Sequence, residues 1–198
     1  MTSIVAAFDF DNTLTVRDSL VPFLFEQAGF LKASYYLAAL IPDFLQFQCG
    51  YLSRQATKEK ILTKFFKGVS FCDLQISAKR YAANQLDSYL NPQAVERLKW
   101  HQQQGHRCIL VSASIDLYLC PWAERHGFEK TLASTLALDK QERVTGLLKG
   151  NNCWGAEKVK RIEDYLGPRE SYQLYAYGDS RGDQELLALA DYPFYRSF

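Results

Sequence analysis

The sequence lacks the cysteine pattern that a disulfide-stabilised or zinc-binding domain requires. Its five cysteines are odd in number, and no two of them form a Cys-x-x-Cys pair. Extracellular disulfide frameworks use an even number of cysteines, and zinc sites use closely spaced pairs. The pattern therefore favours a protein of a reducing compartment, and we predict a cytoplasmic location.

The sequence also lacks an excess of one charge and a long apolar run. Its 23 basic residues nearly cancel its 22 acidic ones, which leaves a formal charge of +1 and no overall field that would attract nucleic acid. The apolar stretch of residues 20–47 is interrupted by Glu26, Lys32 and Asp43, whereas a membrane-spanning helix needs about 18 continuous apolar residues. The apolar run before Asp9 has neither the basic flank nor the cleavage site of a secretory signal. We therefore predict no nucleic-acid partner, no transmembrane segment and no secretion.

What is present is an alternation of apolar strands and amphipathic helices. Patterns of buried strands cover residues 3–10, 106–112, 130–135, 171–177 and 192–195. Helical patterns lie between them at residues 92–104, 116–126, 154–166 and 184–190, and residues 135–149 have the pattern of a hairpin. Strands that alternate with helices predict an open parallel sheet, so the expected fold class is α/β and doubly wound, or Rossmann-like.

A long insert separates the first strand from the rest of this pattern. Residues 19–88 show helical periodicity only, with expected breakpoints at Gly29, Pro42 and Gly50. We therefore predict two units: an α/β core formed by residues 1–17 and 90–198, and a small inserted α-helical unit formed by residues 18–89.

Polar residues stand where several of the predicted strands end. Asp9 and Asp11 end the first strand, Ser112 ends the second, and Asp179 follows the strand at residues 171–177. Ligands of open α/β sheets bind at the carboxyl ends of the strands. We therefore expect the functional site at this edge of the sheet.

The spacing of Asp9 and Asp11 suits phosphoryl transfer. Residues two apart in a strand project from one face, so one carboxylate can attack phosphorus while the other transfers protons to the leaving group and from water. Repulsion between the nucleophile and an anionic phosphate is relieved by cations. The candidates are Lys158 and a divalent metal held by Asp179 and Asp183. Oxygen ligands indicate Mg²⁺.

These residues, in this order, resemble four motifs of the haloacid dehalogenase superfamily of phosphohydrolases. The motifs are Asp-x-Asp-x-Thr at residues 9–13, a serine at 112, a lysine at 158 and Gly-Asp-x-x-x-Asp at 178–183. The resemblance implies a phosphomonoester phosphatase in which Asp9 is the nucleophile and forms an aspartyl-phosphate. It implies that Asp11 is the general acid and base and also binds Mg²⁺ through its backbone carbonyl.

The resemblance assigns roles to the remaining candidates as well. Ser112 and Lys158 bind the phosphate, and Asp179 binds the metal, while Asp183 either binds the metal or holds its ligands. Backbone amides near Asn12 and Ala113 are further candidates for phosphate binding. The predicted metal set is therefore Asp9, Asp11, Asp179 and Asp183.

The helical insert is similar to the cap of the phosphoserine-phosphatase-like branch (subfamily IB), where a cap between the first two motifs selects the substrate. Ser112-Ala113-Ser114 departs from the Ser-Gly-Gly of that branch, and Asp18 lies near its acid for the substrate amine. The apolar, aromatic segments at 20–25 and 30–47 resemble those of phosphatidylglycerophosphate phosphatases. Two substrate classes stay open: a small phosphoserine-like metabolite and a lipid phosphate such as phosphatidylglycerophosphate.

Three other functions compete with the phosphatase hypothesis. A phosphotransferase of the same family would use the same residues. A non-catalytic phosphate-binding protein of the receiver type would also gather aspartates and a lysine at strand ends, but it needs neither Asp11 nor a helical insert. A dehalogenase needs no proton for its halide, so the acid at Asp11 counts against it.

We expect the remaining lysines and histidines that form a pattern to have structural roles. Lysines 60, 64 and 67 lie opposite Ile61, Leu62, Phe65 and Phe66 in a helical projection. We favour a helix that packs its apolar side inward, and a peripheral contact with the inner face of a membrane is the alternative. The three histidines lack metal spacing and are expected to be structural. The oligomeric state is left open.

Overall fold

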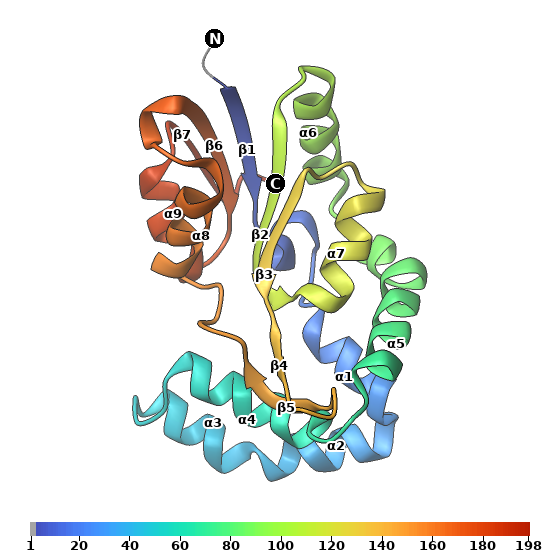
Figure 1. Cartoon of the computed structure of the whole chain (residues 1–198). Coiled ribbons are helices and arrows are strands. Elements are labelled where there is room, and N and C mark those ends of the chain that lie inside the picture. The colour runs from blue at the N-terminus through green and yellow to red at the C-terminus, as the bar shows by residue number, and fades with distance from the viewer. Residues whose placement is uncertain (1–2) are drawn as a thin grey trace.

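The computed structural model describes residues 3–198, so the first two residues of the predicted core lie outside the described part. Its centre is a five-stranded, wholly parallel sheet in the order β3-β2-β1-β6-β7 (Figure 1). The strands are β1 (Ser3–Phe8), β2 (Arg107–Ile115), β3 (Lys130–Ser134), β6 (Tyr172–Gly178) and β7 (Tyr192–Tyr195). All five predicted strands are present. The first ends two residues earlier than predicted, and the second continues three residues further.

Helices cover both faces of this sheet. In Figure 1, α6 (Pro92–Gln103) and α7 (Asp116–Arg125) lie on one side, and α8 (Ala156–Leu166) and α9 (Gln184–Leu189) lie on the other. Side chains alternate along β1, so that Ala6 and Phe8 enter one buried cluster while Val5 and Ala7 enter the second. The predicted doubly wound α/β fold is confirmed.

The local signals in the sequence account for several helix ends. The Asn91 side chain accepts a hydrogen bond from the Gln93 amide at 3.1 Å, and Pro92 occupies the first helical position of α6, where a missing N–H costs nothing. Gly167 ends α8 with a φ of 80°, a conformation that favours glycine.

Five α-helices and a short 3-10 helix (Leu86–Tyr89) form the insert, beyond the carboxyl edge of the sheet (Figure 1). The α-helices are α1 (Leu20–Ala28), α2 (Phe30–Ala39), α3 (Ile41–Gln48), α4 (Arg54–Phe66) and α5 (Phe71–Asn84). Gly29 and Gly50 separate helices as predicted, but the break near Pro42 falls at Leu40, because the proline lies in the first turn of α3. None of the helices within residues 3–198 is long and apolar enough to cross a bilayer.

The apolar side of α4 packs inward, which confirms the favoured interpretation of this helix. Leu62 and Phe66 are buried, and Ile61 and Phe65 pack against the same cluster. That cluster continues from Phe66 to residues of the sheet, so buried contacts join the insert to the core. The division into two units stays a prediction.

A predicted hairpin, β4 (Leu136–Leu138) with β5 (Val144–Leu148), also joins the two parts. Its antiparallel strands leave the main sheet and reach α4 (Figure 1). Gly146 makes the contact: its φ is 88°, and a Cβ atom there would lie 2.3 Å from the Thr63 Cα atom. Only glycine permits this approach.

We expect Gly146→Ala to destabilise the fold more than Gly150→Ala. Gly150 also has a positive φ, of 83°, but a Cβ atom there would meet no other part of the chain within 4 Å. Alanine at 150 should therefore cost only the backbone strain of about 1 kcal/mol, and alanine at 146 should cost about 2–4 kcal/mol because steric overlap is added. Urea unfolding followed by tryptophan fluorescence measures both, and equal losses would contradict the packing of β5 on α4.

One buried histidine links α6 to the sheet. His101 is fully buried, its Nε2 atom lies 2.9 Å from the Tyr177 hydroxyl, and its Nδ1 atom lies 2.8 Å from Nδ1 of His106. Burial, together with His106 and Arg97, lowers the pKa of His101 to about 4. The imidazole is therefore neutral in the folded protein near neutral pH, in agreement with the predicted structural role.

This depressed pKa predicts a loss of stability in acid. A histidine with an ordinary pKa of about 6.5 in the unfolded chain takes up its proton before the folded protein does, so the fold loses free energy as the pH falls from 6.5 towards 4. Between pH 7 and 4.5 we expect the difference in free energy of unfolding between wild type and His101→Gln to shrink by about 2–3 kcal/mol. Urea titrations across this range test it, and parallel pH curves for the two proteins would contradict it.

Candidate active site

The order of the strands gathers the predicted site residues at one edge of the sheet. Strands β2, β1 and β6 are neighbours at its centre. Asp9 directly follows β1, and its amide donates to the Tyr177 carbonyl oxygen at 3.0 Å. Ser112 lies in the last part of β2, and Asp179 directly follows β6. The three residues, far apart in sequence, therefore reach the same place.

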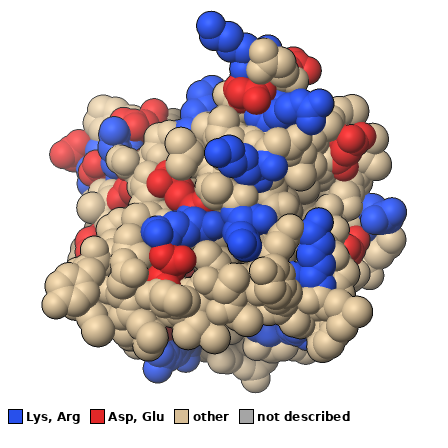
Figure 2. Space-filling model, turned by 90° about the horizontal axis from the view of Figure 1, so that it is seen from below, with Lys and Arg blue, Asp and Glu red and all other residues tan. Residues whose placement is uncertain are grey.

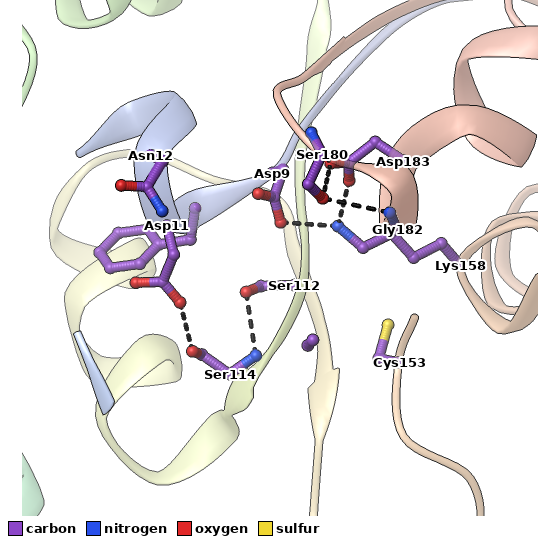
Figure 3. Close-up of polar contacts among 12 residues, drawn as sticks. Asp9, Asp11, Asn12, Ser112, Ser114, Cys153, Lys158, Ser180, Gly182 and Asp183 are labelled. Atoms are coloured by element: carbon purple, nitrogen blue, oxygen red, sulfur yellow. Dashed lines mark hydrogen bonds and ion pairs between the residues drawn. The ribbon is translucent and has the colours of Figure 1, made fainter. Parts of the chain in front are cut away.

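The Lys158 ammonium lies between two carboxylates (Figure 3). Its Nζ atom is 2.6 Å from an oxygen of Asp9 and 2.6 Å from an oxygen of Asp183. The second oxygen of Asp183 accepts from the amide and the hydroxyl of Ser180, at 3.0 and 2.7 Å. Gly178 leaves the necessary space, because a Cβ atom there would lie 2.4 Å from the Asp183 Cβ atom. Both oxygens of Asp183 are thus engaged by the protein.

Burial governs the ionisation of these groups. Burial, opposed by Lys158 and assisted by Asp183, raises the pKa of Asp9 to about 7. Burial lowers the pKa of Lys158, but the carboxylates of Asp9 and Asp183 outweigh it and hold that pKa above its usual range. The lysine is therefore a permanent cation at neutral pH, and a further cation beside Asp9 would favour its ionised form.

The arrangement suits a divalent metal ion. Carboxylate oxygens of Asp9, Asp179 and Asp183 lie within 4.8 Å of one another. Lys158 contacts two of these carboxylates, and hard oxygen donors of this kind match Mg²⁺. Because Asp183 has both oxygens engaged, Asp9 and Asp179 are the better direct ligands. The Asp11 side chain lies outside this group, and metal binding by its backbone carbonyl stays a prediction.

The backbone conformation that positions Asp11 differs from the strand that the sequence predicted. The prediction assumed strand geometry through Asp11, but β1 ends at Phe8 and residues 10–14 form a wide turn in which Asn12 has a φ of 59°. The turn is closed by the Thr15 amide, which donates to the Phe10 carbonyl oxygen at 3.0 Å. The Asp11 carboxylate accepts from the Ser19 amide at 2.7 Å and from the Ser114 hydroxyl (Figure 3). Burial raises its pKa to about 6. A carboxyl group with this pKa can exchange protons near neutral pH.

The predicted phosphate-binding groups are present but not all free. Ser112 is buried, and its hydroxyl oxygen accepts from the Ser114 amide at 3.1 Å, so its own proton remains available to a ligand. The Asn12 amide already donates to the Thr15 hydroxyl at 3.2 Å. Ala113 presents its carbonyl to Lys58 and Ser134. Ser112 and Lys158 are therefore stronger candidates than the Asn12 amide, and phosphate binding by backbone amides near Asn12 and Ala113 stays a prediction.

A cavity of about 390 Å³ contains these groups and extends to the helical insert. The sheet edge contributes the polar wall, and α3 and α4 contribute an aromatic and basic wall, lined by Phe44, Phe47, Arg54, Lys58 and Ile61. Asp18 is exposed at the cavity, where its carboxylate accepts from the Val21 amide at 2.8 Å and so caps the start of α1.

Lys58 is the main residue that sequence reasoning missed. Its Nζ atom donates to the Ala113 carbonyl and, at 3.1 Å, to the Asn152 side chain, and burial lowers its pKa to about 8. It thus connects α4 directly to strand β2, at the residue after Ser112. The sequence contains a signal for this residue, because Arg54 and Lys58 are four residues apart and therefore lie on the same side of a helix. The prediction for this helix rested on its later lysines, such as Lys60 and Lys64, which alternate with apolar residues. Ser114, the partner of Asp11, stood out in the sequence only as a departure from a motif.

Comparisons with known proteins find relatives of this chain in sequence. The sequence profile of the haloacid dehalogenase-like hydrolases matches residues 6–188. Protein CicA of Caulobacter vibrioides is 34% identical over 195 residues, which cover 98% of this chain and 86% of the relative.

Solved structures share the fold at lower identity. A protein of unknown function from Bordetella pertussis Tohama I superimposes with a TM-score of 0.83 at 23% identity, covering 98% of this chain and 89% of the other. A substrate-bound phosphoserine phosphatase complex superimposes with a TM-score of 0.65 at 17% identity, covering 98% and 86%. A phospho-aspartyl intermediate analogue of phosphoserine phosphatase gives 0.61 at 19%, covering 96% and 84%.

We expect Lys158→Met to destabilise the protein strongly when metal is absent. The variant leaves Asp9 and Asp183 close together without their cation, and removing one partner of a buried ion pair costs about 3–5 kcal/mol. Lys160→Met, on the exposed side of the same helix, is the matched control and should change stability by less than about 0.5 kcal/mol. Urea unfolding with a chelator at pH 8 measures both, and a stable Lys158→Met protein would show that Lys158 is not needed to neutralise the site.

Proposed function

The chain belongs to the haloacid dehalogenase-like hydrolases, and from this we propose that it is a Mg²⁺-dependent phosphatase acting on phosphate monoesters. One observation carries the proposal. The carboxylate of Asp9 lies at the cavity with its cation, Lys158, at 2.6 Å, and the proton-exchanging carboxyl of Asp11 lines the same cavity. A nucleophile, a cation and an acid are what cleavage of a phosphate ester requires.

The reaction follows from the positions of these groups. An oxygen of Asp9 attacks phosphorus and forms an aspartyl-phosphate, while the leaving alkoxide takes its proton from Asp11. The Asp11 carboxylate then takes a proton from water, whose oxygen attacks phosphorus and breaks its bond to Asp9, so that inorganic phosphate leaves. Ser19 and Ser114 hold the Asp11 carboxylate in place throughout.

Cations hold the anionic phosphoryl group beside the carboxylate of Asp9 during the reaction. Lys158 and the Ser112 hydroxyl, which both line the cavity, would bind phosphoryl oxygens. Asp9 and Asp179 would hold Mg²⁺, with Asp183 fixing Lys158 beside them. When bound, the ion supplies positive charge that neutralises the phosphoryl oxygens and favours the ionised form of Asp9.

The structures with which the chain shares its fold support this chemistry. They include a phosphoserine phosphatase with bound substrate and an analogue of its phospho-aspartyl intermediate. A receiver-type protein is disfavoured because Asp11 is held inside the cavity by two hydrogen bonds. A phosphotransferase would form the same aspartyl-phosphate. It differs from a phosphatase in its product, because it transfers the phosphoryl group to an alcohol and releases no inorganic phosphate.

The residues that line the cavity indicate the class of substrate. Phe44 and Phe47 of α3 line the cavity, and the guanidinium of Arg54 lies 5.4 Å from the Phe47 ring and 4.8 Å from the Trp154 ring. Aromatic and cationic groups together suit a phosphate ester with an apolar portion and additional negative charge, which favours a lipid phosphate. Asp18 at the cavity is the feature that supports the alternative, a small phosphoserine-like metabolite with an amine.

The first test is the hydrolysis of p-nitrophenyl phosphate with Mg²⁺ and with chelator. We expect activity to need the metal, to fall by at least about 10³-fold in Asp9→Asn, where the nucleophile is lost, and to fall by about 10²–10⁴-fold in Asp11→Asn, where proton transfer is lost. Asp164→Asn, an exposed acid on α8, is the matched control and should keep full activity.

Each contrary outcome has a distinct meaning. Activity that survives Asp9→Asn overturns the mechanism. A folded, metal-loaded wild type that hydrolyses no aryl phosphate supports the phosphate-binding alternative. Transfer of the phosphoryl group to an added alcohol, in place of free phosphate, supports the phosphotransferase.

A further inference from the structure

Helices α2 and α3 expose large apolar side chains at the end of the molecule farthest from the sheet (Figure 1). We call this set the apolar face. Its members are between 54% and 84% exposed: Phe30, Leu31, Tyr35, Ile41 and Leu45. Within each helix the outward leucines, tyrosine and isoleucine follow a four-residue spacing, which places them on one side. Monomeric soluble proteins rarely leave a contiguous apolar surface of this kind uncovered.

Few charged residues lie in the segment that forms the apolar face. Between Glu26 and Arg54 the chain has only two charged residues, Lys32 and Asp43. The acid is neutralised, because its carboxylate pairs with Lys60 at 2.6 Å. Figure 2 shows the molecule from this end, with a broad region free of charged side chains and, beside it, basic side chains with acidic ones among them.

Two lysines at the border of the apolar face lie close to the same aromatic ring. The ammonium groups of Lys32 and Lys64 lie 5.4 and 5.2 Å from the centre of the Tyr36 ring, on helices α2 and α4. Their charges are not paired with a carboxylate among the ion pairs of residues 3–198. The apolar face is therefore bordered by available positive charge.

We propose that the apolar face binds the surface of an anionic lipid bilayer, with α2 and α3 lying in the plane of the interface. Helices with apolar side chains on one side and lysines at the border bind bilayers in this way, and anionic headgroups attract the lysines. A second copy of the chain fits less well, since a two-fold interface pairs this surface with the same surface of the partner and so brings no negative charge to its lysines.

The position of α3 connects this surface to the cavity. Ile41 and Leu45 point outward from α3, whereas Phe44 and Phe47 of the same helix line the cavity. A helix that lies on the bilayer thus supplies the aromatic wall of the site. The sequence offered a membrane contact only as the alternative interpretation of the lysines of α4. That helix packs its apolar side inward, and the exposed apolar surface belongs to α2 and α3.

Co-sedimentation of the full-length protein with vesicles tests the proposal without any turnover, so its result is independent of the proposed reaction. We expect binding to phosphatidylcholine vesicles that contain about 30% phosphatidylglycerol, whose negative surface potential attracts lysines, and much weaker binding to pure phosphatidylcholine. Leu31→Ser/Leu45→Ser should lower the partition coefficient at least about tenfold, because two apolar side chains no longer leave water. Lys32→Gln/Lys64→Gln should weaken binding to anionic vesicles only.

The matched control is Ile76→Ser on α5, which removes a side chain of 62% exposure outside the apolar face and should leave binding unchanged. Thermal unfolding and hydrolysis of a soluble aryl phosphate check that the Leu31→Ser/Leu45→Ser protein is intact, since neither leucine lines the cavity. Wild type that does not sediment with anionic vesicles overturns the proposal, and so does equal binding by the double leucine variant. A dimer that this variant dissociates, without vesicle binding by wild type, would assign the apolar face to self-association instead.

Discussion

The ammonium of Lys158, buried between the carboxylates of Asp9 and Asp183, is the interaction on which the site depends. It brings together α8, the end of β1 and the turn that follows β6, three segments far apart along the chain. Carboxylates of this kind would repel one another without a cation between them, and burial makes the repulsion stronger. The close packing of Gly178 against Asp183 and the Ser180 hydrogen bonds then fix the acid that holds the lysine.

The helical insert supplies the other half of the cavity, and two contacts place it. Gly146 lets the β4–β5 hairpin approach Thr63 of α4, and Lys58 of the same helix donates to the Ala113 carbonyl beside Ser112. A continuous buried cluster underlies both contacts. The candidate catalytic groups and the residues of the insert that line the cavity are therefore held by one packed structure, although they come from separate parts of the sequence.

Most of the fold was predictable because its signals are local. Apolar runs of strand length, the Asn91-Pro92 start of α6 and the Gly167 end of α8 depend on neighbouring residues only, and the structure has the expected elements in the expected order. The exceptions have local physical reasons too. The turn at residues 10–14 replaces the last residues of the predicted first strand, and it redirects Asp11 from the face of Asp9 to Ser19 and Ser114.

The sequence by itself determined the fold class and the chemical identity of the candidate site. Strand ends, and the order of the acids and the lysine, can be recognised from the amino-acid sequence without knowing which residues are in contact. Only the tertiary structure decided which groups are in contact: that Asp183 engages Lys158 with one oxygen and Ser180 with the other, and that Lys58 enters the cavity from α4. It also decided that α2 and α3, not α4, expose an apolar surface. Helical periodicity shows that a helix has an apolar side, but whether that side is covered depends on neighbours that are distant in sequence.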